Sequence, residues 1–340
     1  MKSFLLPALA AFALSSCTTI NLTHEGALFK KSLESISSAD LKKHLYIIAS
    51  DEMEGRETGS EGQKKAGKYM ISEYKKMGVS HPKAMESFFQ TVPQEYLGAR
   101  RGKTYPESEN ILAFIEGTEK PHEIIVLSAH YDHVGKNKAG EIFNGADDDG
   151  SGTVALMEIA EAFQLAKKAG KAPKRSVLFL HVTAEEIGLV GSKYYVENPI
   201  FPLANTVANL NIDMIGRSDP ENKGKNYVYV IGSDKLSTSL KKINEASNAA
   251  TVNLELNYKY DDPNDPEMLY YRSDHYNFAK NNVPAAFYFD GIHEDYHRPT
   301  DTPDKIDYEL LKKRTQLVFA TAWELANREE RIVVDVKSSQ

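Results

Sequence analysis

Apolar residues follow two rhythms along the 340-residue chain. Short runs rich in Val, Ile, Leu and Phe are typical of buried strands, and apolar residues every three or four positions are typical of helices packed on one face. Strands are predicted at 110–115, 123–128, 176–183, 207–212, 227–231 and 283–289, and helices at 39–49, 63–77, 152–168, 235–249 and 308–326, with an irregular segment at 88–109. Because apolar strands alternate with helices, we expect an α/β fold: a single domain with a mostly parallel, mixed β-sheet and helices on both faces.

The first seventeen residues differ from the rest. Lys2 precedes an apolar run at 4–14, which is too short to span a bilayer stably, and Leu-Ser-Ser-Cys at 14–17 resembles the processing box of bacterial lipoproteins. We therefore expect a lipoprotein signal peptide at 1–16 and a lipid on Cys17 that anchors the protein to the membrane of a bacterial cell envelope, facing the periplasm or in the outer membrane. An ordinary secretory signal is the alternative. The remaining predicted parts are a tether with a first helix at 17–37, a folded domain at 38–330 and a tail at 331–340.

Charge excludes one class of partner. The formal net charge is −7, and the basic residues form no long stripe, so binding to nucleic acid is not indicated. After the N-terminal run, no apolar segment approaches the roughly 18 residues that a membrane-spanning helix needs. Ten His and 48 acidic residues leave many candidate metal ligands.

Three consecutive aspartates, Asp147, Asp148 and Asp149, stand between two glycines just before the helix at 152–168. Adjacent carboxylates repel one another, so a fold that orders them requires compensating positive charge, and a bound metal ion is one source of it. We interpret this loop as half of a metal site, with a solvated acidic turn as the alternative.

Other chemically capable side chains follow the predicted strands, where ligands bind in parallel sheets. Asp132 can accept a hydrogen bond from the imidazole of His130, as the neighbours of metal-binding histidines do. His133 and His181 have no such neighbour, and we interpret both as structural. Each residue alone has an ordinary structural or surface role as its alternative, and the recurrence after several strands is what favours a site. The candidates are His130, Asp132, Asp147, Glu185, Glu186, Asp213 and His297.

Six motifs occur in one order: H-Y-D, N-G-A-D-D-D-G-S-G, T-A-E-E-I-G-L-V-G-S, N-I-D-M-I-G, S-D-H and Y-H-R-P-T-D-T. This order resembles the two-zinc aminopeptidases of metallopeptidase family 28, among them bacterial leucyl aminopeptidases, over about residues 40–328. The resemblance implies the zinc-dependent exopeptidase fold for the domain at 38–330. It also implies hydrolysis of the N-terminal peptide bond of peptides by a hydroxide that bridges two Zn²⁺ ions.

The resemblance also implies roles for individual residues. One zinc would be bound by His130 and Asp213, and the other by Glu186 and His297. Asp147 would bridge the two ions and precede a cis peptide bond to Asp148. The remaining roles are orientation of His130 by Asp132, general base catalysis by Glu185, and a hydrogen bond to the reacting carbonyl from Tyr270 or the adjacent Tyr271.

Three alternatives stay open. Glutaminyl cyclases resemble the same fold and use a single zinc. A carboxypeptidase on the same metal core would need basic residues for a substrate carboxylate, and Arg217, Arg272 and Arg298 lie near the motifs. A non-catalytic binding protein would have lost ligands, and none is missing here. The preferred N-terminal residue and the oligomeric state do not follow from the sequence.

Overall fold

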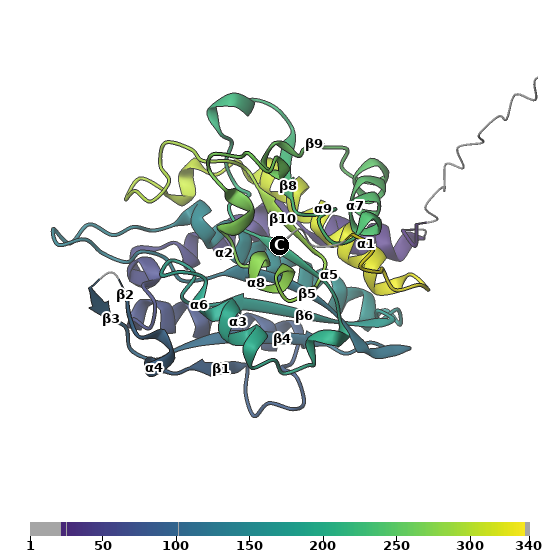
Figure 1. The fold of residues 1–340 in the computed structure, drawn as a ribbon, viewed down its shortest axis with the longest axis horizontal. Coiled ribbons are helices and arrows are strands. Elements are labelled where there is room, and N and C mark those ends of the chain that lie inside the picture. Colours follow the sequence, from purple (N-terminus) through teal and green to yellow (C-terminus); the bar gives the residue numbers. More distant parts are fainter. Residues whose placement is uncertain (1–21, 25, 101, 337–340) are drawn as a thin grey trace, which may run out of the picture.

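An eight-stranded sheet runs through the centre of the protein, whose computed structural model describes residues 22–24, 26–100 and 102–336 (Figure 1). The strands lie in the order β1-β4-β6-β5-β7-β10-β8-β9. Their bounds are β1 Phe89–Val92, β4 Ser108–Ile115, β5 Lys120–His130, β6 Arg175–Val182, β7 Thr206–Ile212, β8 Tyr227–Ile231, β9 Glu255–Asn257 and β10 Ala285–Phe289. The neighbours β6, β5, β7 and β10 are parallel, whereas β4 and β8 join them antiparallel, so the predicted mostly parallel, mixed sheet is confirmed.

Helices cover both faces of the sheet. The helices α5 and α9 contact the central strands on one face, and the shorter α6 and α8 contact β4, β7 and β10. The helices are α1 Ala27–Ser35, α2 Ser38–Ile48, α3 Glu61–Met77, α4 Gln94–Leu97, α5 Gly152–Lys168, α6 Val190–Glu197, α7 Thr238–Ala250, α8 His275–Ala279 and α9 Tyr308–Asn327. Among the described residues, none of these helices has the length and apolar character needed to cross a bilayer.

Alternate residues of the central strands enter two separate cores. Ile125 and Leu127 of β5 belong to the large core beneath α5 and α9, whereas Ile124 and Val126 belong to a smaller core with residues of α6 and α8. Both faces of β5 are therefore buried, which explains why its sequence is apolar without alternation. This burial fixes the carboxyl ends of the central strands relative to one another.

The structure departs from the sequence prediction in short elements. The segment 88–109 contains β1, α4 and a small ribbon of β2 (Ala99–Arg100) and β3 (Lys103–Thr104). Helices α6 and α8 were not predicted because they are too short to show a helical period. The first helix predicted within 17–37 is confirmed as α1, where the Phe29 ring lies 5.5 Å from that of Trp323. The predicted signal peptide and Cys17 lie outside the described residues, so those predictions stay predictions.

Candidate metal centre

The candidate residues converge at the carboxyl ends of the four parallel strands. His130 is the last residue of β5, and Asp213 comes directly after β7. Glu185 and Glu186 follow β6, and His297 lies in the segment after β10. The structure therefore brings together side chains far apart in the sequence at the edge where the sheet topology predicts a ligand site.

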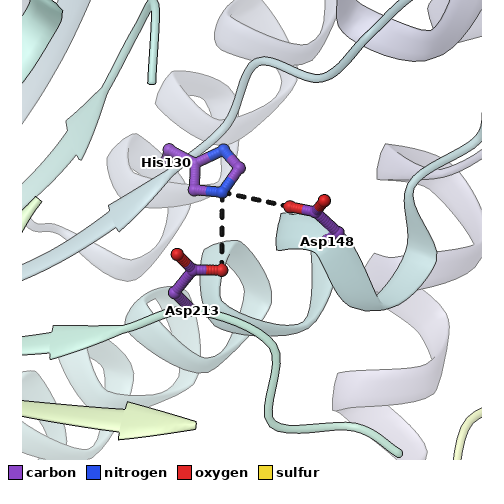
Figure 2. A group of neighbouring side chains, drawn as sticks. All are labelled: His130, Asp148 and Asp213. Carbon is purple, nitrogen blue, oxygen red and sulfur yellow. Dashed lines mark ion pairs between the residues drawn. The ribbon is translucent and has the colours of Figure 1, made fainter. Parts of the chain in front are cut away.

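The first group of candidate ligands consists of His130, Asp148 and Asp213 (Figure 2). The His130 Nε2 atom lies 3.2 Å from Asp148 Oδ1 and 3.6 Å from Asp213 Oδ1. All three side chains are buried. Two ligands of a tetrahedral zinc, each about 2.0 Å from the ion, are roughly 3.3 Å apart. The spacing of these atoms therefore fits ligands that share one zinc ion.

The second group surrounds Glu186. The His297 Nε2 atom lies 3.0 Å from Asp148 Oδ2 and 3.2 Å from Glu186 Oε2. The other oxygen, Glu186 Oε1, lies 2.8 Å from His133 Nδ1. Apart from these ion-pair contacts with one another, the buried atoms Asp148 Oδ2, Glu186 Oε1 and both ring nitrogens of His133 make no hydrogen bond among the described residues. Buried polar atoms without partners are costly, so this group also fits a metal ion.

His133, which was interpreted as structural from the sequence, lies in this group and is a further candidate ligand. The imidazole is buried beside Glu186 and Asp148. In the sequence, His133 has no neighbour that supports it as Asp132 was expected to support His130. The partner of His133 is supplied instead by another strand end, and a search along the sequence does not detect such contacts.

Asp148, and not Asp147, connects the two groups. Its Oδ1 atom faces His130 and its Oδ2 atom faces His297. The Asp147 carboxylate points elsewhere, with Oδ1 accepting a hydrogen bond from Gly216 N at 2.7 Å and Oδ2 lying 3.1 Å from His293 Nε2. The predicted bridging position is therefore wrong by one residue.

The cis peptide bond is displaced by the same single residue, because it joins Asp148 to Asp149 and not Asp147 to Asp148. Three identical residues in a row give the sequence no feature that distinguishes these registers. Asp149 turns away from both groups, and its Oδ1 accepts hydrogen bonds from Gly152 N at 2.9 Å and Met214 N at 3.1 Å.

Two buried residues hold the aspartate loop in place. Asp301, in the segment that also carries His297, accepts from Asp147 N at 3.0 Å and from Asp148 N at 3.2 Å. The fully buried Arg56 donates from Nη1 to Asn144 O at 2.7 Å and from Nη2 to Gly145 O at 2.8 Å. Arg56 thus supplies part of the positive charge that the sequence analysis expected near the aspartates.

The histidines supply further compensation. Burial by itself raises the pKa of the Asp148 carboxyl, but the adjacent histidines, led by His133, outweigh burial and hold this pKa well below its usual range. Burial lowers the pKa of His297, but Asp148 and Glu186 raise it to about 10. The carboxylates and imidazoles of this group therefore attract one another through opposite charges. A bound divalent cation would add positive charge and shift these pKa values further.

Asp132 contacts both His130 and Glu185, but its carboxylate does not bind the His130 imidazole as predicted. Its main-chain oxygen lies 3.0 Å from His130 Nδ1, whereas its carboxylate is 3.9 Å from that nitrogen. The carboxylate accepts instead from Thr58 Oγ1 at 2.8 Å and from Glu185 N at 3.1 Å. Asp132 therefore orients the imidazole through its backbone and positions Glu185 through its side chain.

Comparison with known proteins identifies the family. The sequence model described as peptidase family M28 matches residues 110–322, which is more than half of the chain. The chain belongs to peptidase family M28. A probable leucine aminopeptidase of Trichophyton verrucosum (strain HKI 0517) is 27% identical over 281 residues, covering 74% of each protein.

Solved structures show the same fold. The LapA aminopeptidase of Legionella pneumophila has a TM-score of 0.67 at 20% identity and covers 97% of this chain and 81% of its own. BSAP, a zinc aminopeptidase from Bacillus subtilis, has a TM-score of 0.66 at 17% identity, covering 89% and 99%. A glutaminyl cyclase from Bacteroides thetaiotaomicron bound to N-acetylhistamine has a TM-score of 0.66 at 17% identity, covering 85% and 98%. The predicted family, fold and class of enzyme, a metal-dependent exopeptidase of the aminopeptidase type that acts on peptides, are confirmed.

A serine that the sequence analysis did not identify supports the first group in this M28 peptidase. The Ser273 hydroxyl donates to Asp213 Oδ2 at 2.6 Å and accepts from Asn211 Nδ2 at 2.8 Å. Hydrogen bonds of this kind fix the orientation of a metal-binding carboxylate. Ser273 opens the S-D-H motif, so the motif itself was the available signal.

Tyr270 does not lie where the sequence analysis predicted. Its ring packs 5.4 Å from His275 and against Gly232, and it lines a neighbouring surface groove with Lys235. The cavity beside the first group is lined by Tyr296, whose ring stacks on His297 with the centroids 4.0 Å apart. Tyr270 is the middle residue of the one-turn helix Leu269–Tyr271, and of these three residues only Leu269 lines the cavity.

Proposed function

We propose that this M28 peptidase binds two zinc ions and removes apolar residues from the N-termini of peptides. The observation that carries the proposal is the position of Asp148, whose two oxygens face two separate sets of ligands. A single ion in one set would leave the buried carboxylates of the other set with only the nearby imidazoles to compensate their charge, and buried charge that is poorly compensated is costly.

The first zinc would be held by His130, Asp213 and one oxygen of Asp148, and the second by Glu186, His297 and the other oxygen. Bound zinc acts as a Lewis acid and lowers the pKa of water to near 7. The donor atoms, imidazole nitrogens and carboxylate oxygens, are those that zinc prefers. The second ion needs one histidine beside Glu186. His297 Nε2 lies 3.0 Å from Asp148 and 3.2 Å from Glu186, whereas His133 Nδ1 lies 2.8 Å from Glu186 but 3.7 Å from Asp148, so the more even spacing supports His297 over His133.

Glu185 is the residue that moves the proton. It lines the same cavity as His130, and its Oε2 atom lies 3.9 Å from His130 Nε2. In this position the Glu185 carboxylate takes a proton from the attacking water and passes it to the nitrogen of the departing amine. The hydrogen bond from its backbone N–H to Asp132 keeps the side chain on the cavity wall.

The cavity supports a preference for apolar N-terminal residues. One part of its wall carries the acidic residues, which would hold the free α-ammonium group of a peptide. The rest is mostly apolar, and an apolar wall stabilises a bound side chain by removing it from water. The apolar lining residues are Met214, Leu269, Phe287, Phe289 and Ile292.

Turnover of Leu, Lys and Glu 4-nitroanilides by the zinc-loaded protein, with and without a chelator, tests this proposal. We expect hydrolysis of the Leu substrate, loss of activity with chelator and two zinc ions per chain. Glu185→Gln should retain zinc and lower kcat by at least about 100-fold. Glu294→Gln, which removes a carboxylate whose side chain is 75% exposed, is the matched control. Near-normal turnover by Glu185→Gln would refute the assignment of the base.

The same measurements separate the alternatives. One zinc per chain together with cyclisation of N-terminal glutamine would favour a glutaminyl cyclase, and cleavage of N-blocked peptides would favour a carboxypeptidase. Comparison of zinc content in His297→Ala and His133→Ala decides between the two histidines. We expect the larger loss in His297→Ala.

We also propose that Cys17 carries a lipid that anchors the enzyme to a bacterial cell envelope. The support is the apolar run at 4–14 followed by Leu-Ser-Ser-Cys. The full chain expressed in a bacterium should incorporate labelled fatty acid and partition into a detergent phase. Cys17→Ala should do neither, and labelling that persists in this variant would contradict the proposal.

A further inference from the structure

A single arginine lines the cavity of the candidate metal centre. Among the described residues that form its wall, Arg272 is the one Lys or Arg side chain. The other residues are metal-ligand candidates, Glu185, apolar side chains and Tyr296. A permanent positive charge in a cavity that otherwise carries acids and apolar groups requires an explanation, and charge compensation of the acids is one.

The contacts of Arg272 argue against compensation of the buried acids as its main role. Its Nη1 atom lies 3.3 Å from Oε2 of Glu267, which is not among the described residues that line the cavity, and the two side chains are 39% and 55% exposed. An ion pair this exposed contributes little, about 0–1 kcal/mol, and is easily exchanged. Arg272 is therefore free to pair with another carboxylate.

The other arginines that the sequence analysis noted near the motifs are not available in this way. Arg217 pairs with Asp295 at 3.1 Å, and its side chain is only 12% exposed. Neither Arg217 nor Arg298 is among the described residues that line the cavity. Arg272 is thus the remaining candidate for recognition of an anionic group.

The position of Arg272 places it next to the apolar wall. It directly follows the one-turn helix Leu269–Tyr271, and Leu269 lines the same cavity. A substrate whose ammonium group lies at the acids and whose side chain lies on the apolar wall would bring its next polar groups toward Arg272. Guanidinium binds a carboxylate through two parallel hydrogen bonds, which no other cation in this lining offers.

We propose that Arg272 is a specificity residue that binds a carboxylate of the substrate, so that the enzyme favours substrates carrying one close to the scissile bond. The proposal rests on the aminopeptidase function proposed above. Two sources share this chemistry: the C-terminal carboxylate of a dipeptide and the side chain of an acidic N-terminal residue. The apolar wall beside Arg272 favours the dipeptide, because an acidic N-terminal side chain would have to lie against that wall.

The test compares matched substrates that differ only in the carboxylate. Leu-Gly and Leu-Gly amide examine the C-terminal carboxylate, and Glu and Gln 4-nitroanilides examine the side chain. In Arg272→Gln, we expect KM for Leu-Gly to rise about tenfold, the low end for hydrogen bonds between charged groups at a partly exposed site. The KM for Leu-Gly amide and kcat for both should stay unchanged. A selective loss on Glu 4-nitroanilide alone would assign the side chain as the source.

Three further variants sharpen the result. Arg272→Lys should recover only part of the loss, because an ammonium group cannot form the paired hydrogen bonds. Glu267→Gln releases Arg272 from its ion pair and should lower KM for Leu-Gly. Lys280→Gln removes an exposed positive charge that lines the neighbouring groove and serves as the charge-matched control.

Binding separates this proposal from the proposed function. Calorimetry of Leu-Gly with zinc-loaded Glu185→Gln, with and without Arg272→Gln, measures affinity without turnover. Weaker binding of Leu-Gly, but not of its amide, supports the role of Arg272 even if the catalytic assignments fail. If Arg272→Gln changes KM equally for all four substrates, and changes the affinities for Leu-Gly and Leu-Gly amide equally, the role proposed for Arg272 is wrong.

Discussion

Arg56 connects the early polar segment to the metal centre, and its replacement by Met gives a sharp prediction. The guanidinium is fully buried and donates four hydrogen bonds to main-chain oxygens of Tyr131, Ile48, Asn144 and Gly145, at 2.7–2.9 Å. Two of these oxygens belong to the loop that carries the aspartates. Arg56→Met leaves all four acceptors buried without this donor.

The magnitude follows from the cost of breaking a buried charged contact. Removal of one partner of such a contact destabilises a protein by about 3–5 kcal/mol, and each unpaired buried acceptor costs about 1–3 kcal/mol when no water replaces the donor. We therefore expect Arg56→Met to lose about 4 kcal/mol. For a chain of 340 residues, that loss lowers Tm by roughly 6 °C.

Thermal unfolding in the presence of a chelator measures this effect without the contribution of bound zinc. Arg56→Lys should recover little, because one ammonium group cannot reach four acceptors arranged around a planar fork. The control is Arg331→Gln, since Arg331 is exposed and donates to Ala204 O and Thr206 O. We expect this control to change stability by less than about 0.5 kcal/mol. If Arg56→Met shifts Tm no more than Arg331→Gln does, the structural role assigned to Arg56 is wrong.

Three further predictions concern metal binding and pH. Asp148→Asn should reduce zinc content, measured by elemental analysis, to one ion per chain or fewer, whereas Asp147→Asn should reduce it less; the reverse order would restore the original assignment of the bridge. Ser273→Ala removes the hydrogen bond to Asp213 and should weaken zinc affinity by about 10- to 100-fold in competition with a chromogenic chelator, with unchanged circular dichroism; unchanged affinity would show that this hydroxyl does not orient the ligand. Burial raises the pKa of the Glu158 carboxyl from 4.5 to about 8, so the folded state holds a proton that the unfolded state releases. The contribution of Glu158 to stability is therefore fully present below pH 4.5 and is lost as the pH rises to 8, by about 5 kcal/mol at most. Glu158→Gln removes this dependence and should be more stable than the parent chain at pH 8, by an amount that shrinks toward pH 5 in urea unfolding with chelator; a constant difference across that range would contradict it.

The sequence was sufficient for the parts of the fold that local pattern dictates. Buried strands such as β5 are apolar on both faces, and helix α5 begins and ends where its period predicts. The sheet then places the loops, so residues after different strands could be predicted to meet. The short elements α6 and α8 were missed because their position depends on packing, which a short window does not record.

The finer errors at the site share one physical origin. The choice between Asp147 and Asp148 depends on backbone geometry within a run of identical residues. The role of His133 depends on Glu186, which belongs to a different strand end. Tyr270 was misplaced because the orientation of a side chain in a one-turn helix is set by its neighbours and not by its spacing from a motif.

The position of β10 in the sheet determines when, during synthesis of the chain, the metal centre can form. β10 is the last strand in the sequence, yet it inserts between β7 and β8. The segment that carries His297 follows β10, so His297 can reach Asp148 only after both β10 and this segment have been synthesised. A nascent chain that ends before residue 297 lacks one of the proposed zinc ligands, so we expect no peptidase activity from it.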